Sequence, residues 1–216
     1  PVARGQPALT AAQLIVLRHG RTAWNATGRF QGQADIGLDE RGRAQAEQAA
    51  ELLAELAPTA IHSSDLSRAR QTAAPLAARC GLPVHTDERL REIHVGTWEG
   101  LTIDDLLGQL DDDLKRAYLA GEDVRRSPTG ETVAEVGERA GVALDEIGLA
   151  APDGSTVVVV MHGMAARAGV CRLVGFPAET WKRLSGLHNC GWISVERHLT
   201  GDYWRITEYN VTAPRP

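Results

Sequence analysis

An apolar run near the start of the chain ends in a cation, a titratable ring and a glycine. Residues 14–17 read Leu-Ile-Val-Leu, and Arg18, His19 and Gly20 follow directly. Consecutive Leu and β-branched residues predict a buried parallel strand, and open α/β sheets bind ligands at the carboxyl ends of such strands. Glycine lets another group approach the backbone closely. The junction therefore predicts an anion site that contains a nucleophile.

The same arrangement occurs a second time. Residues 156–161 read Thr-Val-Val-Val-Val-Met, and His162 and Gly163 follow before a helical pattern at 164–174. With 7 His and 22 Gly in 216 residues, chance alone gives about 0.7 His-Gly pairs. Two pairs that each end an apolar strand are much rarer by accident. The alternative is that each pair is only a strand-to-helix turn with a hydrogen-bonded histidine.

Two charged residues in the middle of the chain could complete this chemistry. Arg68 falls in the first turn of a predicted helix, where the helix dipole disfavours a cation unless an anion is bound there. Glu92 lies between apolar neighbours with glycine close by, and a carboxyl that is partly removed from water suits a general acid. The alternatives are a surface pair of Arg68 with Asp65, and a structural pair of Glu92 with Arg89 or Arg91.

The elements that must position these residues alternate along the chain. After a predicted loop at 22–38, the apolar spacing predicts helices at 39–56, 66–79, 102–120 in pieces, 130–149 and 164–174. Strands are predicted between them at 59–62, 84–86 and 156–161, and a turn at 200–202 joins two final strands at 191–196 and 203–209. This order predicts a three-layer α/β/α sandwich. We expect a mostly parallel sheet of about six strands with one antiparallel edge strand. One domain is expected over residues 1–216, with a small helical lid at about 102–129.

Composition narrows the classes of partner and compartment. The net charge is −5 and no run of Lys and Arg occurs, which argues against a nucleic-acid surface. An odd count of 3 cysteines without CxxC spacing indicates neither a disulfide framework nor a zinc site. No signal peptide is readable at 1–13, and the apolar runs are too short to span a bilayer. We therefore expect a cytoplasmic protein without nucleic-acid or membrane partners.

Taken together, these residues resemble the histidine phosphatase superfamily, the group that includes cofactor-dependent phosphoglycerate mutase. The resemblance extends from Leu14 to about Tyr209, and motifs this numerous, in this order, are highly specific. They are Leu17-Arg18-His19-Gly20 with Thr22 and Trp24-Asn25, Gln31-Gly32 with Asp35, Leu38 and Gly42, residues 63–72, Leu90-Arg91-Glu92, Gly96, Trp98-Glu99-Gly100, Gly130-Glu131-Thr132, His162-Gly163 and Asn189.

The resemblance implies a reaction and assigns roles to the matching residues. His19 would attack phosphorus to form a phosphohistidine, and Glu92 would protonate the leaving alcohol and then accept a proton from water. The attacking nitrogen of His19 must be neutral, so its other nitrogen should donate to a backbone carbonyl. Fixed cations and N–H donors stabilise the transferred phosphoryl group, so we expect no metal and no cofactor. The residues implied around the phosphate are Arg18, Arg68, His162, Asn25 and Gly163, with Gln31, Gly32 and His94 as further binding candidates.

The sequence departs from the mutase branch at positions that hold phosphoglycerate there. Val95 and Ile103 replace a tyrosine and a lysine of the mutases, and Gln31-Gly32-Gln33 replaces their Thr-Gly-Trp or Ser-Gly-Trp. The insertion between Glu92 and His162 is also shorter, and a smaller lid favours hydrolysis because it excludes less water. We therefore expect a phosphomonoester hydrolase, with a phosphoglycerate mutase and a catalytically inactive phosphate-binding module as the alternatives.

Within the phosphatases, residues 92–102 and 203–210 resemble the actinobacterial glucosyl-3-phosphoglycerate phosphatases. This makes glucosyl-3-phosphoglycerate, or a related sugar or glycerate phosphate, the candidate small-molecule substrate. Two features depart from that subgroup, namely Arg125-Arg126 in the lid and His188-Asn189-Cys190. The arginine pair could bind a substrate carboxylate or could be a solvated lid charge. Relatives are often dimers, so a homodimer is expected.

Overall fold

The structure, a computed structural model, describes residues 12–198 and 202–214. Within these residues one sheet has the strand order β3-β2-β4-β1-β5-β6. The strands are β1 (Gln13–Arg18), β2 (Ala60–Ser63), β3 (Val84–Thr86), β4 (Thr156–Met161), β5 (Trp192–Arg197) and β6 (Trp204–Val211). Strands β1 to β4 pair in parallel, whereas β5 is antiparallel to both β1 and β6. The predicted mostly parallel sheet with an antiparallel edge is confirmed.

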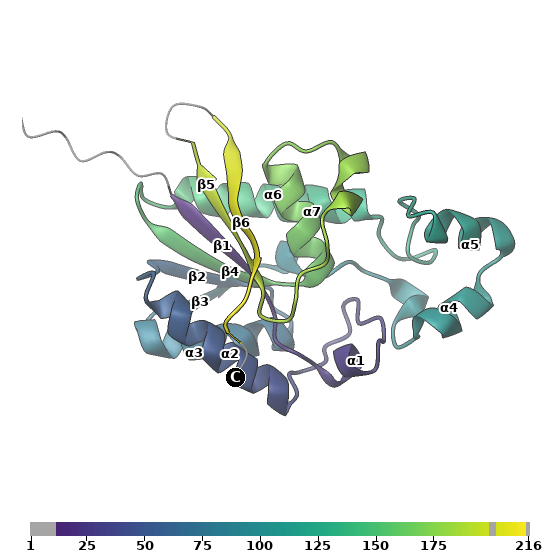
Figure 1. Cartoon of the computed structure of the whole chain (residues 1–216), viewed down its shortest axis with the longest axis horizontal. Coiled ribbons are helices and arrows are strands. Elements are labelled where there is room, and N and C mark those ends of the chain that lie inside the picture. The colour runs from purple at the N-terminus through teal and green to yellow at the C-terminus, as the bar shows by residue number, and fades with distance from the viewer. Residues whose placement is uncertain (1–11, 199–201, 215–216) are drawn as a thin grey trace, which may run out of the picture.

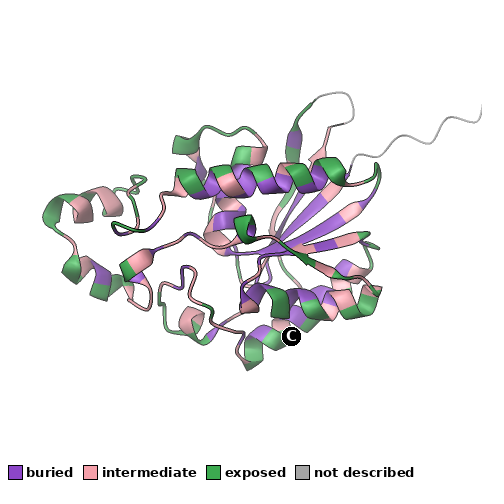
Figure 2. Cartoon of the chain, turned by 180° about the vertical axis from the view of Figure 1, so that it is seen from behind, coloured by how far each residue is buried: buried purple, intermediate pink, exposed green. Residues whose placement is uncertain are grey.

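Helices cover both faces of this sheet (Figure 1). On one face lie α2 (Glu40–Ala54) and α3 (Ser67–Cys80), and on the other lie α6 (Val133–Ala150) and α7 (Gly163–Leu173). Strand β1 shows why a continuous apolar run is needed, since Leu14 and Val16 pack toward α6 and α7 while Ile15 and Leu17 pack toward α2 and α3. The buried residues follow the inner faces of these helices and most of the length of the central strands (Figure 2).

The register of the sheet aligns the ends of the two strands that precede the His-Gly pairs. Arg18 lies opposite Met161, which places His19 and His162 side by side beyond neighbouring strand ends. Ser63 of β2 lies opposite Val160, so that Ser64 reaches the same edge. This edge is the carboxyl end of parallel strands, where open α/β sheets bind ligands.

A helical extension projects from this edge of the sheet (Figure 1). It contains α4 (Ile103–Gln109) and α5 (Asp112–Leu119), which confirms the prediction of a helix in pieces. The Trp98 ring packs against the rings of Phe30 and Tyr118, with centroids 6.3 and 5.8 Å apart. These aromatic contacts connect α5 to the loops beside the sheet.

Three features differ from the sequence-based expectation or lie outside the structure. The segment predicted as a loop contains the short helix α1 (Ala23–Ala26), because Thr22 and Asn25 form a capping box. Short 3₁₀ helices also occur as η1 (Glu88–Leu90), η2 (Gly96–Trp98) and η3 (Ala178–Arg183). Most of the turn predicted at 200–202 and of the segment 1–13 lies outside the described residues. No helix of the part that the structure describes is long and apolar enough to cross a membrane.

Candidate active site

His19 directly follows β1 and is 2% exposed. Its Nδ1 lies 2.7 Å from the carbonyl oxygen of Gly20, which accepts the ring proton and leaves Nε2 as the nitrogen with the lone pair. Burial, together with the charges of Arg68 and Arg18, lowers the pKa of His19 well below the usual histidine value. The predicted backbone carbonyl partner of the ring is thus present, and the lowered pKa favours the neutral ring.

A close backbone approach fixes the loop that carries His19. A Cβ on Gly20 would lie 2.4 Å from the carbonyl oxygen of Gly42, and one on Gly42 would lie 2.0 Å from the carbonyl oxygen of Arg21. Only glycine fits at either position, so the first turn of α2 packs directly onto the loop. The Gly20 N–H also donates to Thr72 Oγ1 at 3.0 Å.

Arg68 is fully buried at the start of α3. Its Nη1 and Nη2 donate to the carbonyl oxygens of Ala34 and Gly32 at 2.6 and 2.7 Å. The alternative of a surface pair with Asp65 is wrong, because that carboxylate instead pairs with Arg91. The guanidinium is therefore held in place beside His19 by neutral carbonyl acceptors rather than by a carboxylate.

The His162 ring lies next to both the Arg68 guanidinium and the His19 ring. Its ring centroid is 5.1 Å from that of His19 in an edge-on arrangement. Arg68 Nε donates to His162 Nδ1 at 3.1 Å, and His162 Nε2 lies 2.9 Å from Ser64 Oγ. Burial and the charge of Arg68 lower the pKa of His162 well below its ordinary value. Both ring nitrogens are thus engaged, so a contact with a phosphoryl oxygen requires the ring to exchange one of these bonds.

Glu92 meets the first turn of α7. Its Oε1 accepts from the N–H groups of Ile93 and Ala165, both at 2.9 Å, and its Oε2 accepts from the N–H of Met164 at 3.1 Å. The alternative in which Glu92 pairs with Arg89 or Arg91 is wrong. Those arginines pair instead with acidic residues of their own, namely Asp87 and Glu146 for the first and Asp65 and Glu88 for the second.

An arginine on α6 holds the loop that carries Glu92. Arg139 Nη1 donates to the carbonyl oxygens of Arg89 and Arg91 at 2.8 and 2.7 Å, and its Nη2 donates to that of Glu92 at 2.9 Å. The same guanidinium pairs with Glu131 at 2.7 Å. The backbone at Glu92 is therefore fixed by a packed helix rather than by its own secondary structure.

A cavity of about 320 Å³ opens in front of His19. Five of its lining residues are arginines and one is acidic, namely Arg18, Arg29, Arg68, Arg126, Arg167 and Glu92. The Nε of Arg18 is buried without a partner among the described residues, and a Cβ on Gly163 would lie 3.3 Å from it. As the first residue of α7, Gly163 also has an N–H without an intrahelical acceptor. Unpaired donors and excess positive charge make this cavity an anion site.

Two side-chain amides on the cavity wall also present donors. Asn25 Oδ1 accepts from Thr22 and from Asn189 Nδ2, and Gln31 Oε1 accepts from Thr22 Oγ1 at 2.9 Å. Since both carbonyl oxygens are occupied, the NH₂ groups are the part of each amide that remains for a ligand.

Most of the predicted site residues converge on this cavity. Its lining contains Arg18, His19, Asn25, Gln31, Gly32, Arg68, Glu92 and Gly163. His162 lies behind it, and His94 is not among the lining residues because its Nδ1 lies 2.9 Å from the carbonyl oxygen of Thr129. Sequence reasoning missed Arg29, Phe30, Tyr118, Met164 and Arg167. For Arg167 a signal existed, since it lies four residues after Gly163 and so about one helical turn along the same face.

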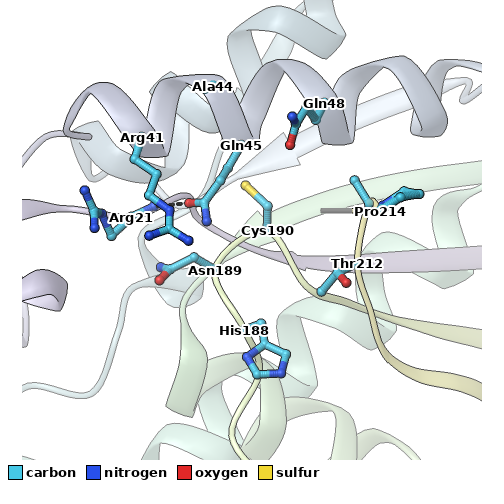
Figure 3. Close-up of a pocket in the computed structure, with 11 residues that line it drawn as sticks. Arg21, Arg41, Ala44, Gln45, Gln48, His188, Asn189, Cys190, Thr212 and Pro214 are labelled. Atoms are coloured by element: carbon cyan, nitrogen blue, oxygen red, sulfur yellow. Dashed lines mark hydrogen bonds between the residues drawn. The ribbon is translucent and has the colours of Figure 1, made fainter. Parts of the chain in front are cut away.

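A separate cavity of about 560 Å³ lies between the first turns of α2 and the chain after His188 (Figure 3). Asn189 connects it to the site, because its side chain donates to the carbonyl oxygen of His19 at 3.2 Å. Burial raises the pKa of the Cys190 thiol in its wall to about 12, which keeps that sulfur protonated. Among residues 12–198 and 202–214, no group of three or more His, Cys, Asp or Glu side chains could hold a metal ion.

Comparison with known proteins places these features in a family. Residues 14–212 match the family model of the histidine phosphatase superfamily (branch 1). The chain belongs to this superfamily.

Individual relatives carry different names. A glucosyl-3-phosphoglycerate phosphatase of Mycobacterium tuberculosis is 38% identical, over 95% of this chain and 97% of the relative. A probable phosphoglycerate mutase of Yersinia pestis is 40% identical, over 85% of this chain and 84% of the relative. The solved structure of a mycobacterial glucosyl-3-phosphoglycerate phosphatase with VO3 is also similar, with a TM-score of 0.83 and 38% identity over 93% of this chain and 99% of that one.

Proposed function

We propose that the chain hydrolyses small phosphomonoesters through a phosphohistidine at His19. The observation that carries this proposal is a buried, neutral imidazole whose Nδ1 is fixed by the Gly20 carbonyl, at a cavity lined by five arginines. A neutral ring with one nitrogen held as a donor presents the other as a nucleophile. The similarity to named phosphatases over most of the chain supports the same reaction class.

The reaction proceeds in two displacements at phosphorus. The N–H groups of Arg18, Arg68 and Gly163 bind the phosphoryl oxygens while His19 Nε2 forms a bond to phosphorus. The bond from phosphorus to the ester oxygen breaks, and Glu92 gives that oxygen its proton. Water then attacks phosphorus, Glu92 takes a proton from it, and the P–N bond breaks to release inorganic phosphate. His162 acts mainly through its contacts with Arg68 and His19.

The cavity wall supports hydrolysis over phosphoryl exchange. Val95, where the mutase branch has a tyrosine, is buried and gives the cavity an apolar wall. Ile103, where that branch has a lysine, is 41% exposed and does not line the cavity. Neither residue offers a hydrogen bond or charge that would retain a bisphosphate, although a relative named as a probable mutase keeps this candidate in the test below.

We further propose glucosyl-3-phosphoglycerate, or a related sugar or glycerate phosphate, as the substrate, because relatives over most of the chain carry that name. The predicted homodimer is checked by light scattering of the purified protein, and the predicted cytoplasmic location by fractionation of the source cells.

The test measures phosphate release from p-nitrophenyl phosphate, 3-phosphoglycerate and glucosyl-3-phosphoglycerate, with and without 2,3-bisphosphoglycerate. Hydrolysis without the bisphosphate is expected, together with an acid-labile, base-stable phosphoenzyme in rapid-quench samples. His19→Ala should lose both, whereas His85→Ala, at an exposed position on β3, should lose neither. Isomerisation of 3-phosphoglycerate that requires the bisphosphate would favour the mutase, and the absence of any turnover would favour a binding module.

A further inference from the structure

A second cavity adjoins the phosphate cavity. It has a volume of about 570 Å³, and four residues line both cavities, namely Tyr118, Arg126, Met164 and Arg167. Both volumes fall in the range of about 300–1,000 Å³ that is typical of small-molecule sites. A substrate that reaches past the phosphate cavity therefore meets these four side chains first.

The two arginines at this junction have no acidic partner within 4.0 Å among the described residues. Arg126 Nη1 donates to the carbonyl oxygen of Val124, and its guanidinium lies over the rings of Tyr118 and Trp98 at 5.4 and 5.9 Å. Burial, together with the nearby charge of Arg167, lowers the pKa of Arg126. Two cations are thus held near each other with part of their hydration removed.

Some N–H groups of Arg167 have no strong hydrogen-bond acceptor in the described part of the chain. Its Nη1 donates to the carbonyl oxygen of Leu184 at 3.1 Å, and its Nη2 lies 3.0 Å from Met164 Sδ, a weak acceptor. Its Nε is buried without a partner in the part of the chain that the structure describes. A buried N–H of a charged group that lacks an acceptor is costly unless a ligand supplies one.

Two nearby arginines have carboxylate partners within the protein and so need no ligand to balance their charge. Arg125, next to Arg126 in sequence, pairs with Glu135 at 2.5 Å, and Arg172, farther along α7 than Arg167, pairs with Glu138 at 2.6 Å. Of the two arginines at 125 and 126, Arg125 therefore fits the solvated alternative, whereas Arg126 lines both cavities. The contrast singles out Arg126 and Arg167 as the pair that an anion would complete.

The second cavity has the chemistry of a site for hydroxyl groups. Its lining includes Glu122, Asp123, Glu179 and Lys182, which offer carboxylate acceptors beside one ammonium donor. The Asp123 oxygens already accept from the N–H groups of Val133 and Ala134, which leaves the two glutamates as the more available acceptors. A polyhydroxylated group suits such a wall better than a second phosphate, which the carboxylates would repel.

We infer that Arg167, with Arg126, binds a carboxylate of the substrate next to the reacting phosphate, and that the second cavity holds a sugar attached to the same acid. The inference rests on the proposed function and assigns its selectivity to this junction. What it adds is which side chains meet the acid and which cavity holds the sugar of the substrate proposed above.

The first experiment compares two substrates that differ in the carboxylate. For 3-phosphoglycerate over glycerol 3-phosphate, Arg167→Gln should lower the ratio of kcat/KM about 10- to 100-fold, as expected when a charged hydrogen-bond partner is lost. Arg172→Gln, the matched control on α7, should leave the ratio unchanged. An unchanged ratio in Arg167→Gln would overturn the assignment, whereas failure of the proposed function itself would appear as no turnover of p-nitrophenyl phosphate by the unmodified protein.

The second experiment tests the sugar cavity. Ala178 is exposed and lines the second cavity but not the first, so Ala178→Phe narrows only that space. The kcat/KM ratio of glucosyl-3-phosphoglycerate to 3-phosphoglycerate should fall about 10-fold or more. Ala44→Phe, at an exposed position on α2, is the matched control and should change nothing. If the kcat/KM ratio is unchanged in Ala178→Phe, the sugar binds elsewhere and the assignment of the second cavity is wrong.

Discussion

Acidification from about pH 7.5 to about pH 5.5 should destabilise the folded chain by about 3 kcal/mol, because two buried histidines stay neutral in the fold. His19 and His162 are 2% and 0% exposed, and burial is the first cause of the lowered pKa of each. In the unfolded chain each ring has an ordinary pKa of about 6.5 and takes up a proton as the pH falls.

The magnitude follows from proton linkage. One ring that binds a proton only when unfolded costs about 1.4 kcal/mol of stability between one pH unit above and one unit below its unfolded pKa, so two rings cost about 2.7 kcal/mol. The stability they contribute is complete above about pH 6.5 and is lost as the pH falls below it. Burial and the neighbouring His85 also lower the pKa of His62, but solvent at that half-buried ring makes its contribution smaller.

The assay is urea unfolding followed by tryptophan fluorescence across this pH range, in buffers without phosphate because phosphate would bind the folded state. His19→Asn and His162→Gln should each reduce the loss by about half, whereas His85→Asn, which acts only through the half-buried His62, should reduce it much less. The carboxylates with lowered pKa values, such as Asp65 and Glu131, titrate below this window. A flat stability profile, or identical profiles for all variants, would refute the reasoning.

Three substitutions test the positioning of the site. Glu92→Gln should lower kcat far more for glycerate esters than for p-nitrophenyl phosphate, whose leaving group needs little protonation; equal losses would remove Glu92 as the acid. Gly42→Ala should cost about 1–3 kcal/mol of stability in urea unfolding, because its methyl meets the Arg21 carbonyl oxygen. Arg139→Met should remove the guanidinium partner of Glu131 and the side-chain donor to the carbonyl oxygens of Arg89 and Arg91, and should lower kcat without raising KM, as measured by steady-state kinetics.

Apolar periodicity predicted the strands and helices well, because the burial of apolar side chains determines where these elements form. Strands β1 and β4 are apolar on both faces, and the helix after β4 starts where Gly163 follows His162. The start of α3 shows the limit of such reasoning. Its N-cap is Leu66, which has no side-chain hydrogen bond to the helix, and the Ser67 N–H instead donates to Asp35 from the loop before α2, a partner that local sequence does not reveal.

The sequence predicted the site residues that belong to recognisable motifs. It did not predict the contacts that depend on packing between distant parts of the chain. Arg18, His19, Arg68 and Glu92 line one cavity as expected. Their hydrogen-bond partners could not be predicted from the sequence, because bonds such as that from Arg68 Nε to His162 Nδ1 join residues 94 positions apart. Side-chain direction decided the remainder, as the different contacts of Arg125 and Arg126 show.

Arg139 on α6 fixes the backbone around Glu92. Because of this contact, the orientation of Glu92 and the choice of substrate depend on different parts of the chain. Glu92, the proposed acid, is oriented by α6 and α7, whereas the segment 102–129 reaches the phosphate cavity through Tyr118 and Arg126. A chimera that grafts another relative's segment onto this scaffold should change the part of substrate choice that depends on Tyr118 and Arg126, while Arg167 and the residues that break the ester bond stay those of the host. That part of the specificity can thus be redesigned without rebuilding the reaction centre.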